Sequence, residues 1–178
     1  MHNVKLITAV ACAALGFGST SAMAQQWIVN CASHLCLDAT QIAPGGRVQV
    51  STCSAKNPEL RGQQWDANKP QSQNIQNRWI ADNNQNGGCL DIFVNPPSNW
   101  PQTTECNSYL QAEKWNFTQS NQGKLISNVY TGECLEDVSL PTTSPPDTVG
   151  LVKAPCDGTK STQKWKWVNV GDPNLACP

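Results

Sequence analysis

Short apolar segments recur along the chain, and clusters of Gly, Pro, Asn and Asp separate them. Three of these segments combine bulky apolar side chains with a polar end and are each predicted to form a β-strand: residues 27–30, 79–82 and 125–128. At residues 48–51, strand alternation places Val48 and Val50 on one face and Gln49 and Ser51 on the other. Beyond residue 24, no segment shows the three- and four-residue apolar spacing of an amphipathic helix. The pattern predicts an all-β domain.

Three motifs recur in the same order in three successive stretches of the chain. The first is a Cys-Leu-acid triplet, at residues 36–38, 89–91 and 134–136. The second is an extended segment that ends in a cysteine, at positions 53, 106 and 156. The third is a Gln-x-Trp or Gln-x-Trp-like triplet, whose tryptophans Trp65, Trp115 and Trp165 are spaced 50 residues apart. The domain is therefore built from three similar units, each too small to bury its own core. With its opening segment, each unit is predicted to contain four short strands, twelve in all.

The first 24 residues have the composition of a secretory signal peptide. A weakly basic start precedes an apolar stretch at residues 6–17, and Ala22-Met23-Ala24 has the small side chains of a cleavage site. An apolar stretch of this length is too short to span a membrane. Export to the periplasm or the extracellular space is expected, with residues 25–178 as one domain. A lipoprotein anchored at Cys12 is the alternative.

The composition of the chain limits the cellular compartments and the classes of partner that can be expected for it. Removal of the leader leaves eight of the nine cysteines, an even number that favours disulfides in an exported protein. Charged residues make up 14% of the chain, below the roughly 25% of ordinary soluble domains. The net charge of -1 provides no field that would attract nucleic acid or an anionic membrane. We expect no nucleic-acid partner and no insertion into a membrane.

The three in-phase copies of Cys-Leu-acid, the strand ending in Cys, and Gln-x-Trp resemble the ricin B-chain family of lectins. The resemblance extends from Trp27 to about Val170. It implies a β-trefoil, in which three pseudo-symmetric four-strand repeats form a six-stranded barrel capped by three hairpins. It also implies that the three repeat tryptophans pack in a shared core.

The repeat also limits how the cysteines can pair, because each copy holds one early and one late cysteine. We predict one disulfide in each hairpin: Cys36–Cys53, Cys89–Cys106 and Cys134–Cys156. Cys31 and Cys177 remain near the two ends of the domain, which a trefoil brings together, and we predict that they pair. The alternative is that Cys177 forms a bridge to another chain.

Catalysis has little support in the sequence. His34 lies between Cys31 and Cys36, but a zinc site needs four ligands with free thiolates. No serine lies in a Gly-x-Ser-x-Gly elbow. Glu136 and Asp137 are neighbours, and adjacent residues of a strand point to opposite faces. We expect no enzymatic activity, no metal and no cofactor.

Sugar binding is what the resemblance implies. In such lectins the acid of the Cys-Leu-acid triplet accepts hydrogen bonds from the sugar. An aromatic ring two residues before the late cysteine stacks on the sugar, and an amide just before Gln-x-Trp completes the site. This chain departs from that pattern in every repeat. The aromatic positions hold Ser51, Thr104 and Ala154, and the amide positions hold Gly62, Ala112 and Thr162. Repeat three has Glu136 for the aspartate, and repeat two has Glu113 for the glutamine.

A partial site can still be outlined. Trp100 follows a Pro-rich loop, and in an extended segment it shares a face with Gln102 and Thr104. An exposed tryptophan there could replace the missing ring. The candidate carbohydrate contacts are therefore Asp38, Gln49, Asp91, Trp100 and Gln102.

The sequence favours a secreted, non-catalytic domain that binds glycans or glycoconjugates. The alternative is a trefoil whose sugar sites have decayed and which binds a secreted partner protein, as in the non-catalytic subunits of cytolethal distending toxins. The missing rings at positions 51, 104 and 154 favour this alternative. A trefoil protease inhibitor is a third hypothesis, and the Gln-x-Trp motifs argue against it.

Overall fold

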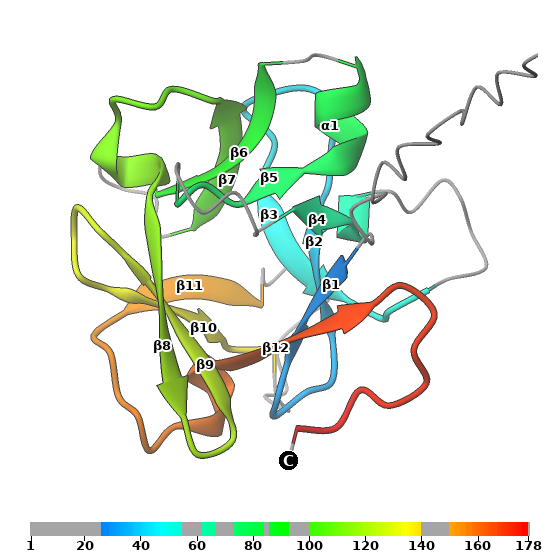
Figure 1. Ribbon diagram of the computed structural model, residues 1–178, viewed down its shortest axis with the longest axis vertical. Coiled ribbons are helices and arrows are strands. Elements are labelled where there is room, and N and C mark those ends of the chain that lie inside the picture. Colours follow the sequence, from blue (N-terminus) through cyan, green and yellow to red (C-terminus); the bar gives the residue numbers. More distant parts are fainter. Residues whose placement is uncertain are drawn as a thin grey trace, which may run out of the picture.

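The computed structural model describes residues 26–54, 62–66, 73–83, 86–92, 100–139 and 150–177. The predicted leader and its cleavage site, with Cys12, lie outside these ranges. Within them the chain forms twelve strands, one short α-helix and two single-turn 3-10 helices (Figure 1). The strands are β1 (Gln26–Asn30), β2 (Cys36–Ala39), β3 (Val48–Ser51), β4 (Trp65–Asp66), β5 (Gln76–Asn77), β6 (Gly87–Ile92), β7 (Pro101–Glu105), β8 (Trp115–Ser120), β9 (Gly123–Asn128), β10 (Cys134–Asp137), β11 (Leu151–Ala154) and β12 (Lys164–Asn169). The helices are α1 (Arg78–Asn83), η2 (Gln111–Glu113) and η3 (Ser161–Gln163).

The strands fall into three successive sets of four, as the repeat predicts. The two middle strands of each set form an antiparallel hairpin: β2–β3, β6–β7 and β10–β11. The outer strands form the barrel, in which β1 pairs with β12 and β4, β4 with β5, and β9 with β8 and β12. An antiparallel bridge between Asn74 and Lys114 joins the start of the second repeat to its end. The predicted β-trefoil is confirmed.

The three repeat tryptophans form the centre of the core. Their side chains are fully buried, together with the leucine of each Cys-Leu-acid triplet. Each indole N–H donates to the backbone carbonyl of the leucine in its own repeat: Trp65 to Leu37 at 2.8 Å, Trp115 to Leu90 at 2.9 Å, and Trp165 to Leu135 at 3.2 Å. A buried indole N–H usually pairs with an acceptor, and these three bonds tie the barrel to its hairpins.

All four predicted disulfides are present. Three close the hairpins: Cys36–Cys53, Cys89–Cys106 and Cys134–Cys156, with Cα–Cα distances of 5.0–5.1 Å. The fourth, Cys31–Cys177, joins residues 146 apart in sequence. The structure therefore has the predicted intramolecular pairing of Cys31 with Cys177.

The predicted strand at residues 79–82 is wrong, because these residues lie in helix α1. The strand that opens the second repeat is β5, which ends five residues before the end of the predicted strand. Its Asn77 lies 12 residues before Cys89, whereas Asn30 and Asn128 lie six residues before their early cysteines. The six extra residues form the helix, and the Asn77 Oδ1 accepts a hydrogen bond of 3.3 Å from the N–H of Ile80 as an N-cap does.

Ile80 is fully buried, which anchors the helix to the core. Gly88 lies beneath it with φ of +88°, and a Cβ there would lie 2.8 Å from the Ile80 Cβ. Glycine is therefore required at position 88 both by backbone conformation and by close packing. The expectation of no helix fails because a helix of six residues, fewer than two turns, is too short to show an apolar periodicity.

Candidate functional site

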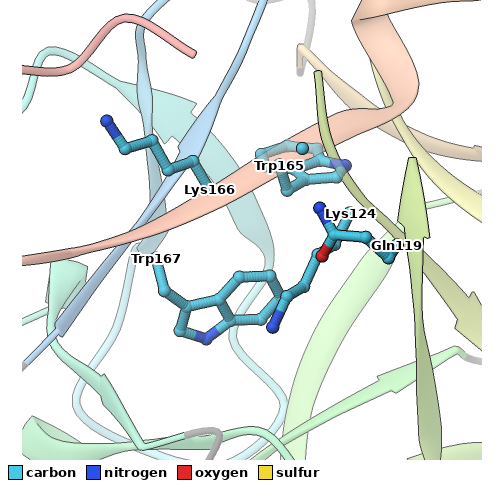
Figure 2. Close-up of a pocket in the computed structure, with 6 residues that line it drawn as sticks. Gln119, Lys124, Trp165, Lys166 and Trp167 are labelled. Carbon is cyan, nitrogen blue, oxygen red and sulfur yellow. The ribbon is translucent and has the colours of Figure 1, made fainter. Parts of the chain in front are cut away.

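The described residues form a pocket of about 250 Å³ beside β8, β9 and β12, lined in part by Lys124 and Trp167 (Figure 2). None of the residues predicted to bind carbohydrate lines it. The predicted residues lie instead on the hairpins.

The hairpins place the three acids at equivalent positions. Asp38 on β2 lies opposite Gln49 on β3, and Asp91 on β6 lies opposite Gln102 on β7. In both hairpins, the register thus places a predicted acid opposite a predicted glutamine. In the third repeat the partner of Glu136 is an apolar residue, Val152.

The site of the first repeat is filled by its own residues. Asp38 is 8% exposed, and its Oδ2 accepts a hydrogen bond of 2.6 Å from the Ser51 hydroxyl. The amide of Gln63 donates to the same hydroxyl oxygen at 2.6 Å. Burial raises the pKa of Asp38, and the hydrogen bonds from Ser51 and Gln63 partly oppose this. A Cβ at Gly62 would lie 2.4 Å from the Ala39 carbonyl oxygen and 2.6 Å from Asp38 Oδ1, so this position has no room for the amide side chain of a sugar site.

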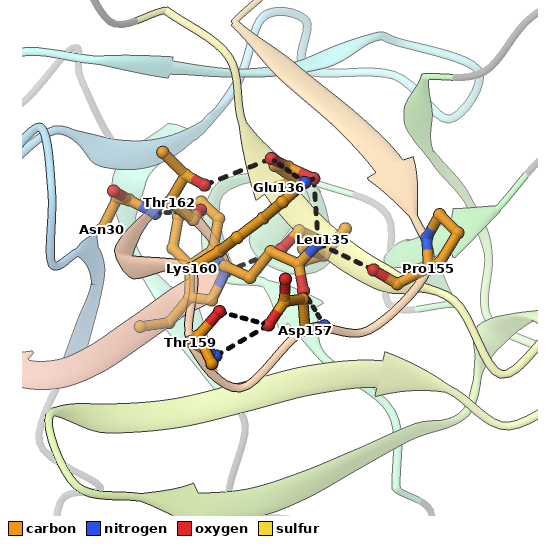
Figure 3. A network of polar contacts seen from close by, with 10 residues as sticks. Asn30, Leu135, Glu136, Pro155, Asp157, Thr159, Lys160 and Thr162 are labelled. Carbon is orange, nitrogen blue, oxygen red and sulfur yellow. Dashed lines mark hydrogen bonds and ion pairs between the residues drawn. The ribbon is translucent and has the colours of Figure 1, made fainter.

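The site of the third repeat is also occupied (Figure 3). Glu136 accepts hydrogen bonds from Gln163 at 2.9 Å and Thr162 at 3.2 Å, and it pairs with the Lys160 ammonium at 3.3 Å. Burial alone would raise the pKa of Glu136, but the hydrogen bonds from Gln163 and Lys160, the charge of Lys160 and the Thr162 hydroxyl hold it below its ordinary value. A sugar hydroxyl would have to displace these partners.

The second repeat differs from both. Asp91 is 8% exposed, and its Oδ1 is buried with no hydrogen-bond partner in the part of the chain that the structure describes. Burial raises the pKa of Asp91, and a hydrogen bond from the backbone of Ile92 partly opposes the increase. Among the three equivalent acids, Asp91 is the one with a fully buried oxygen that has no hydrogen-bond partner among the described residues.

The replacement of glutamine by Glu113 explains this vacant acceptor. Gln63 and Gln163 use their amide N–H groups as donors inside the site, but a carboxylate has no such donor. Glu113 is fully buried and accepts from the Asn107 backbone at 2.6 Å and the Thr104 hydroxyl at 3.3 Å. Burial raises the pKa of Glu113, and the neighbouring charge of Asp91 raises it further. Two acidic groups therefore lie side by side in this repeat.

Trp100 lies at the edge of this hairpin, immediately before β7, and is 43% exposed. The Arg47 guanidinium carbon lies 3.8 Å from the centre of its ring, a cation–π contact that covers one face. Along β7, Thr103 is buried, whereas Gln102 and Thr104 are partly exposed, which agrees with the predicted alternation. The loop before Trp100, residues 93–99, lies outside the described residues.

Two residues near this site were missed by the sequence analysis. Tyr109 and Leu110 lie between Cys106 and η2 and are 88% and 47% exposed. Counted from the late cysteines, Leu110 is equivalent to Lys160, whose ammonium reaches Glu136. Counting residues from each late cysteine would have placed this apolar pair at the rim of the Asp91 site.

The structure shows no metal-binding arrangement among the residues that it covers. His34 is exposed, and its neighbours Cys31 and Cys36 are both in disulfides. Within the same ranges, no helix combines the length and apolar character required to cross a membrane.

The arrangement of three disulfide-closed hairpins on a barrel with a tryptophan triad can be compared with known proteins. The sequence profile of the ricin-type beta-trefoil lectin domain matches residues 24–165. The chain belongs to this family. No curated protein matches this chain.

Solved structures support the fold of this ricin-type domain. It matches the designed threefold symmetric protein ThreeFoil with a TM-score of 0.58 and 18% identity, covering 81% of this chain and 97% of that one. A non-toxic homologue of type II RIPs from Momordica charantia, in complex with α-methyl-D-galactoside, matches with a TM-score of 0.58 and 23% identity over 80% of this chain and 46% of that one. An exo-β-1,3-galactanase from Clostridium thermocellum matches with a TM-score of 0.60 and 22% identity over 83% of this chain and 30% of that one. The chain spans less than half the length of both natural proteins.

A domain of the same fold forms part of this galactanase, which is an enzyme. At these identities the solved structures establish the fold alone. The geometry of the second repeat is therefore the basis for a functional proposal.

Proposed function

We propose that the domain binds carbohydrate through its second repeat, at a site centred on Asp91 and Gln102. The observation that supports this most directly is the unsatisfied Asp91 Oδ1, because the equivalent acids in the other repeats bind their own neighbours. A buried acceptor without a donor costs about 1–3 kcal/mol. A ligand hydroxyl could supply that donor after a small rotation of the carboxylate.

The residues around Asp91 fit the chemistry of a sugar. Its carboxylate accepts hydroxyl hydrogen bonds, and the amide of Gln102 on the opposite strand both donates and accepts. Trp100 is 43% exposed and offers aromatic surface at the edge of the same hairpin. Because the site is on a hairpin surface and hydrogen bonds there compete with water, we expect weak affinity at a single site.

A glycan and polysaccharide array with multivalently displayed, oxidised protein tests this proposal. We expect a defined class of ligand to bind, and we expect Asp91→Asn and Trp100→Ala each to abolish that binding. Glu136→Gln is the matched control, because its carboxylate is already occupied by its own repeat, and it should retain binding. Retained binding in both Asp91→Asn and Trp100→Ala would place the carbohydrate site elsewhere.

Protein recognition is the second candidate, and the pair Tyr109 and Leu110 favours it. These neighbours are 88% and 47% exposed on a loop anchored by Glu113. Exposed tyrosine is typical of the contacts that dominate protein interfaces. A blank array from folded protein, together with a secreted partner whose binding is lost in Tyr109→Ser, would favour this function.

We also propose that the chain is exported and that residues 1–24 are removed as a signal peptide. Four disulfides among the described residues support an oxidising compartment. Mass spectrometry of the secreted protein should show Gln25 as the first residue. Retention of a lipid-modified chain beginning at Cys12 would instead indicate a lipoprotein.

A further inference from the structure

The pocket beside β8, β9 and β12 is separate from the three hairpin sites. Strand pairing places Gln119, Lys124 and Trp165 side by side on these three neighbouring strands. Trp167 follows two residues later on β12 and therefore shares the face of Trp165. The resulting pocket, of about 250 Å³, is smaller than a drug-sized site and suits a single sugar unit (Figure 2).

Trp167 has a feature that packing alone does not explain. It lies two residues after the core tryptophan of its repeat, and the equivalent residue of the second repeat is Phe117. The two rings meet edge to face, with centroids 5.0 Å apart and planes at 90°. The Trp167 indole N–H is buried without a hydrogen-bond partner in the described part of the chain. Phenylalanine would fill this position without leaving a buried donor unsatisfied, so the larger indole suggests a role in recognition.

The charged groups of the pocket are positive. None of the six lining residues is acidic. The Lys124 ammonium lies over the Trp167 ring, 5.3 Å from its centre, in a cation–π contact. Lys166 extends away from that ring (Figure 2), and its ammonium donates to the carbonyls of Asn174 and Ala176. Lys124 is therefore the ammonium placed to meet a ligand that lies on Trp167.

We propose that this pocket is a second carbohydrate site that selects an acidic sugar unit. The indole contacts the apolar face of the sugar ring, the Gln119 amide contacts its hydroxyls, and Lys124 pairs with its carboxylate or sulfate. This site is independent of Asp91, and its existence does not require that the second-repeat proposal be correct.

Titration of the oxidised protein with trigalacturonic acid, followed by NMR, tests the proposal. Its fully methyl-esterified form is the neutral control, and galactose 6-sulfate distinguishes a sulfate from a carboxylate as the preferred group. We expect shifts of the Trp167 indole resonance with trigalacturonic acid and an affinity that falls with added salt. We expect the methyl ester to bind up to about fivefold more weakly, since a partly exposed ion pair contributes up to about that factor.

Four variants separate recognition from folding and from the second repeat. Lys124→Met should weaken binding of trigalacturonic acid about fivefold, whereas Lys124→Arg should retain it, because the charge is kept. Trp167→Phe should weaken binding several-fold without lowering the midpoint of thermal unfolding, because it removes a buried donor that lacks a partner. Asp91→Asn should leave binding of this probe unchanged.

Several results would overturn the proposal. Equal binding of the acid and its methyl ester would show that the pocket does not select for a negative charge. Unchanged binding in both Lys124→Met and Trp167→Phe would place the probe elsewhere. Loss of binding in Asp91→Asn alone would assign the acidic sugar to the hairpin, and no shift with either anionic probe would reject an acidic-sugar site here.

Discussion

Glu113→Gln restores the glutamine that the other two repeats carry, and we expect it to stabilise the protein at neutral pH. Gln163 shows what the new side chain can do in this position. Its carbonyl oxygen accepts from the Asp157 backbone at 2.7 Å, and its amide donates to Glu136 at 2.9 Å. In the variant, the equivalent amide can keep the bond from the Asn107 backbone and donate toward Asp91.

The size of the effect follows from the bonds gained. Glu113 accepts two hydrogen bonds, and it leaves the Asp91 Oδ1 without a donor. One new hydrogen bond to a charged acceptor contributes about 1.5–3 kcal/mol, and we expect a gain of about 2 kcal/mol in the free energy of unfolding. For a domain of this size, that corresponds to an increase in Tm of about 4–8 °C.

The sign of the pH dependence is also determined. The fold raises the pKa of Glu113 above its ordinary value of 4.5. A carboxyl group with a raised pKa contributes most to stability when it is protonated, and this contribution is lost as pH rises from the unfolded-state pKa through the folded-state pKa. The advantage of the glutamine variant should therefore be small near pH 4, grow as pH rises, and then level off.

Thermal and urea unfolding of the oxidised proteins, from about pH 4 to about pH 8, measures this difference. Gln163→Glu is the reciprocal control: it removes a donor from Glu136 and should destabilise the protein at neutral pH but not at low pH. A Glu113→Gln variant that is no more stable at neutral pH, or whose advantage does not depend on pH, would refute the reasoning.

Three further predictions concern the scaffold. Trp115→Phe should lower the free energy of unfolding by about 3 kcal/mol, because it leaves a cavity and deprives the Leu90 carbonyl of its donor; urea denaturation measures the loss, and a change below about 1 kcal/mol would contradict it. Asn128→Ala should lower the free energy of unfolding by about 2–3 kcal/mol, since this buried side chain accepts from the Tyr130 and Thr131 N–H groups of its own turn and donates to the Ala112 carbonyl. The same assay applies, and an unchanged midpoint would count against it. Replacing both Cys31 and Cys177 by serine should lower the free energy of unfolding by up to about 5 kcal/mol, because their disulfide closes the longest of the four disulfide loops. Because this disulfide lies within one chain, the native protein should run as a monomer on a non-reducing gel.

The sequence was sufficient to predict the trefoil, the tryptophan core and the disulfides. The tryptophan core and the three hairpin disulfides depend on motifs that repeat with one period, and the same motif makes the same local contacts in each copy. Cys31–Cys177 was predicted instead from the two ends of the domain, which a trefoil brings together. Trp65, Trp115 and Trp165 each bond to the leucine of their own repeat. Where the period was interrupted the prediction failed: the six residues inserted before Cys89 form helix α1, and the sequence placed a strand there.

The occupancy of the three equivalent sites depended on the tertiary structure. Asp38, Asp91 and Glu136 look alike in sequence, but only the tertiary structure shows that Asp38 leaves no room for a side chain at Gly62 and that Lys160 reaches Glu136. The departure at Glu113 was visible in the sequence, whereas its consequence, an Asp91 oxygen without a donor among the described residues, was not.

Sequence by itself determined the architecture of this protein, because burial, strand alternation and disulfide pairing follow periodic local patterns. The tertiary structure decided which surfaces are free to bind. The contact of Arg47 with Trp100 and the pocket at Lys124 and Trp167 join segments far apart in the chain. Such contacts depend on side-chain positions in three dimensions, and no spacing along the sequence specifies them.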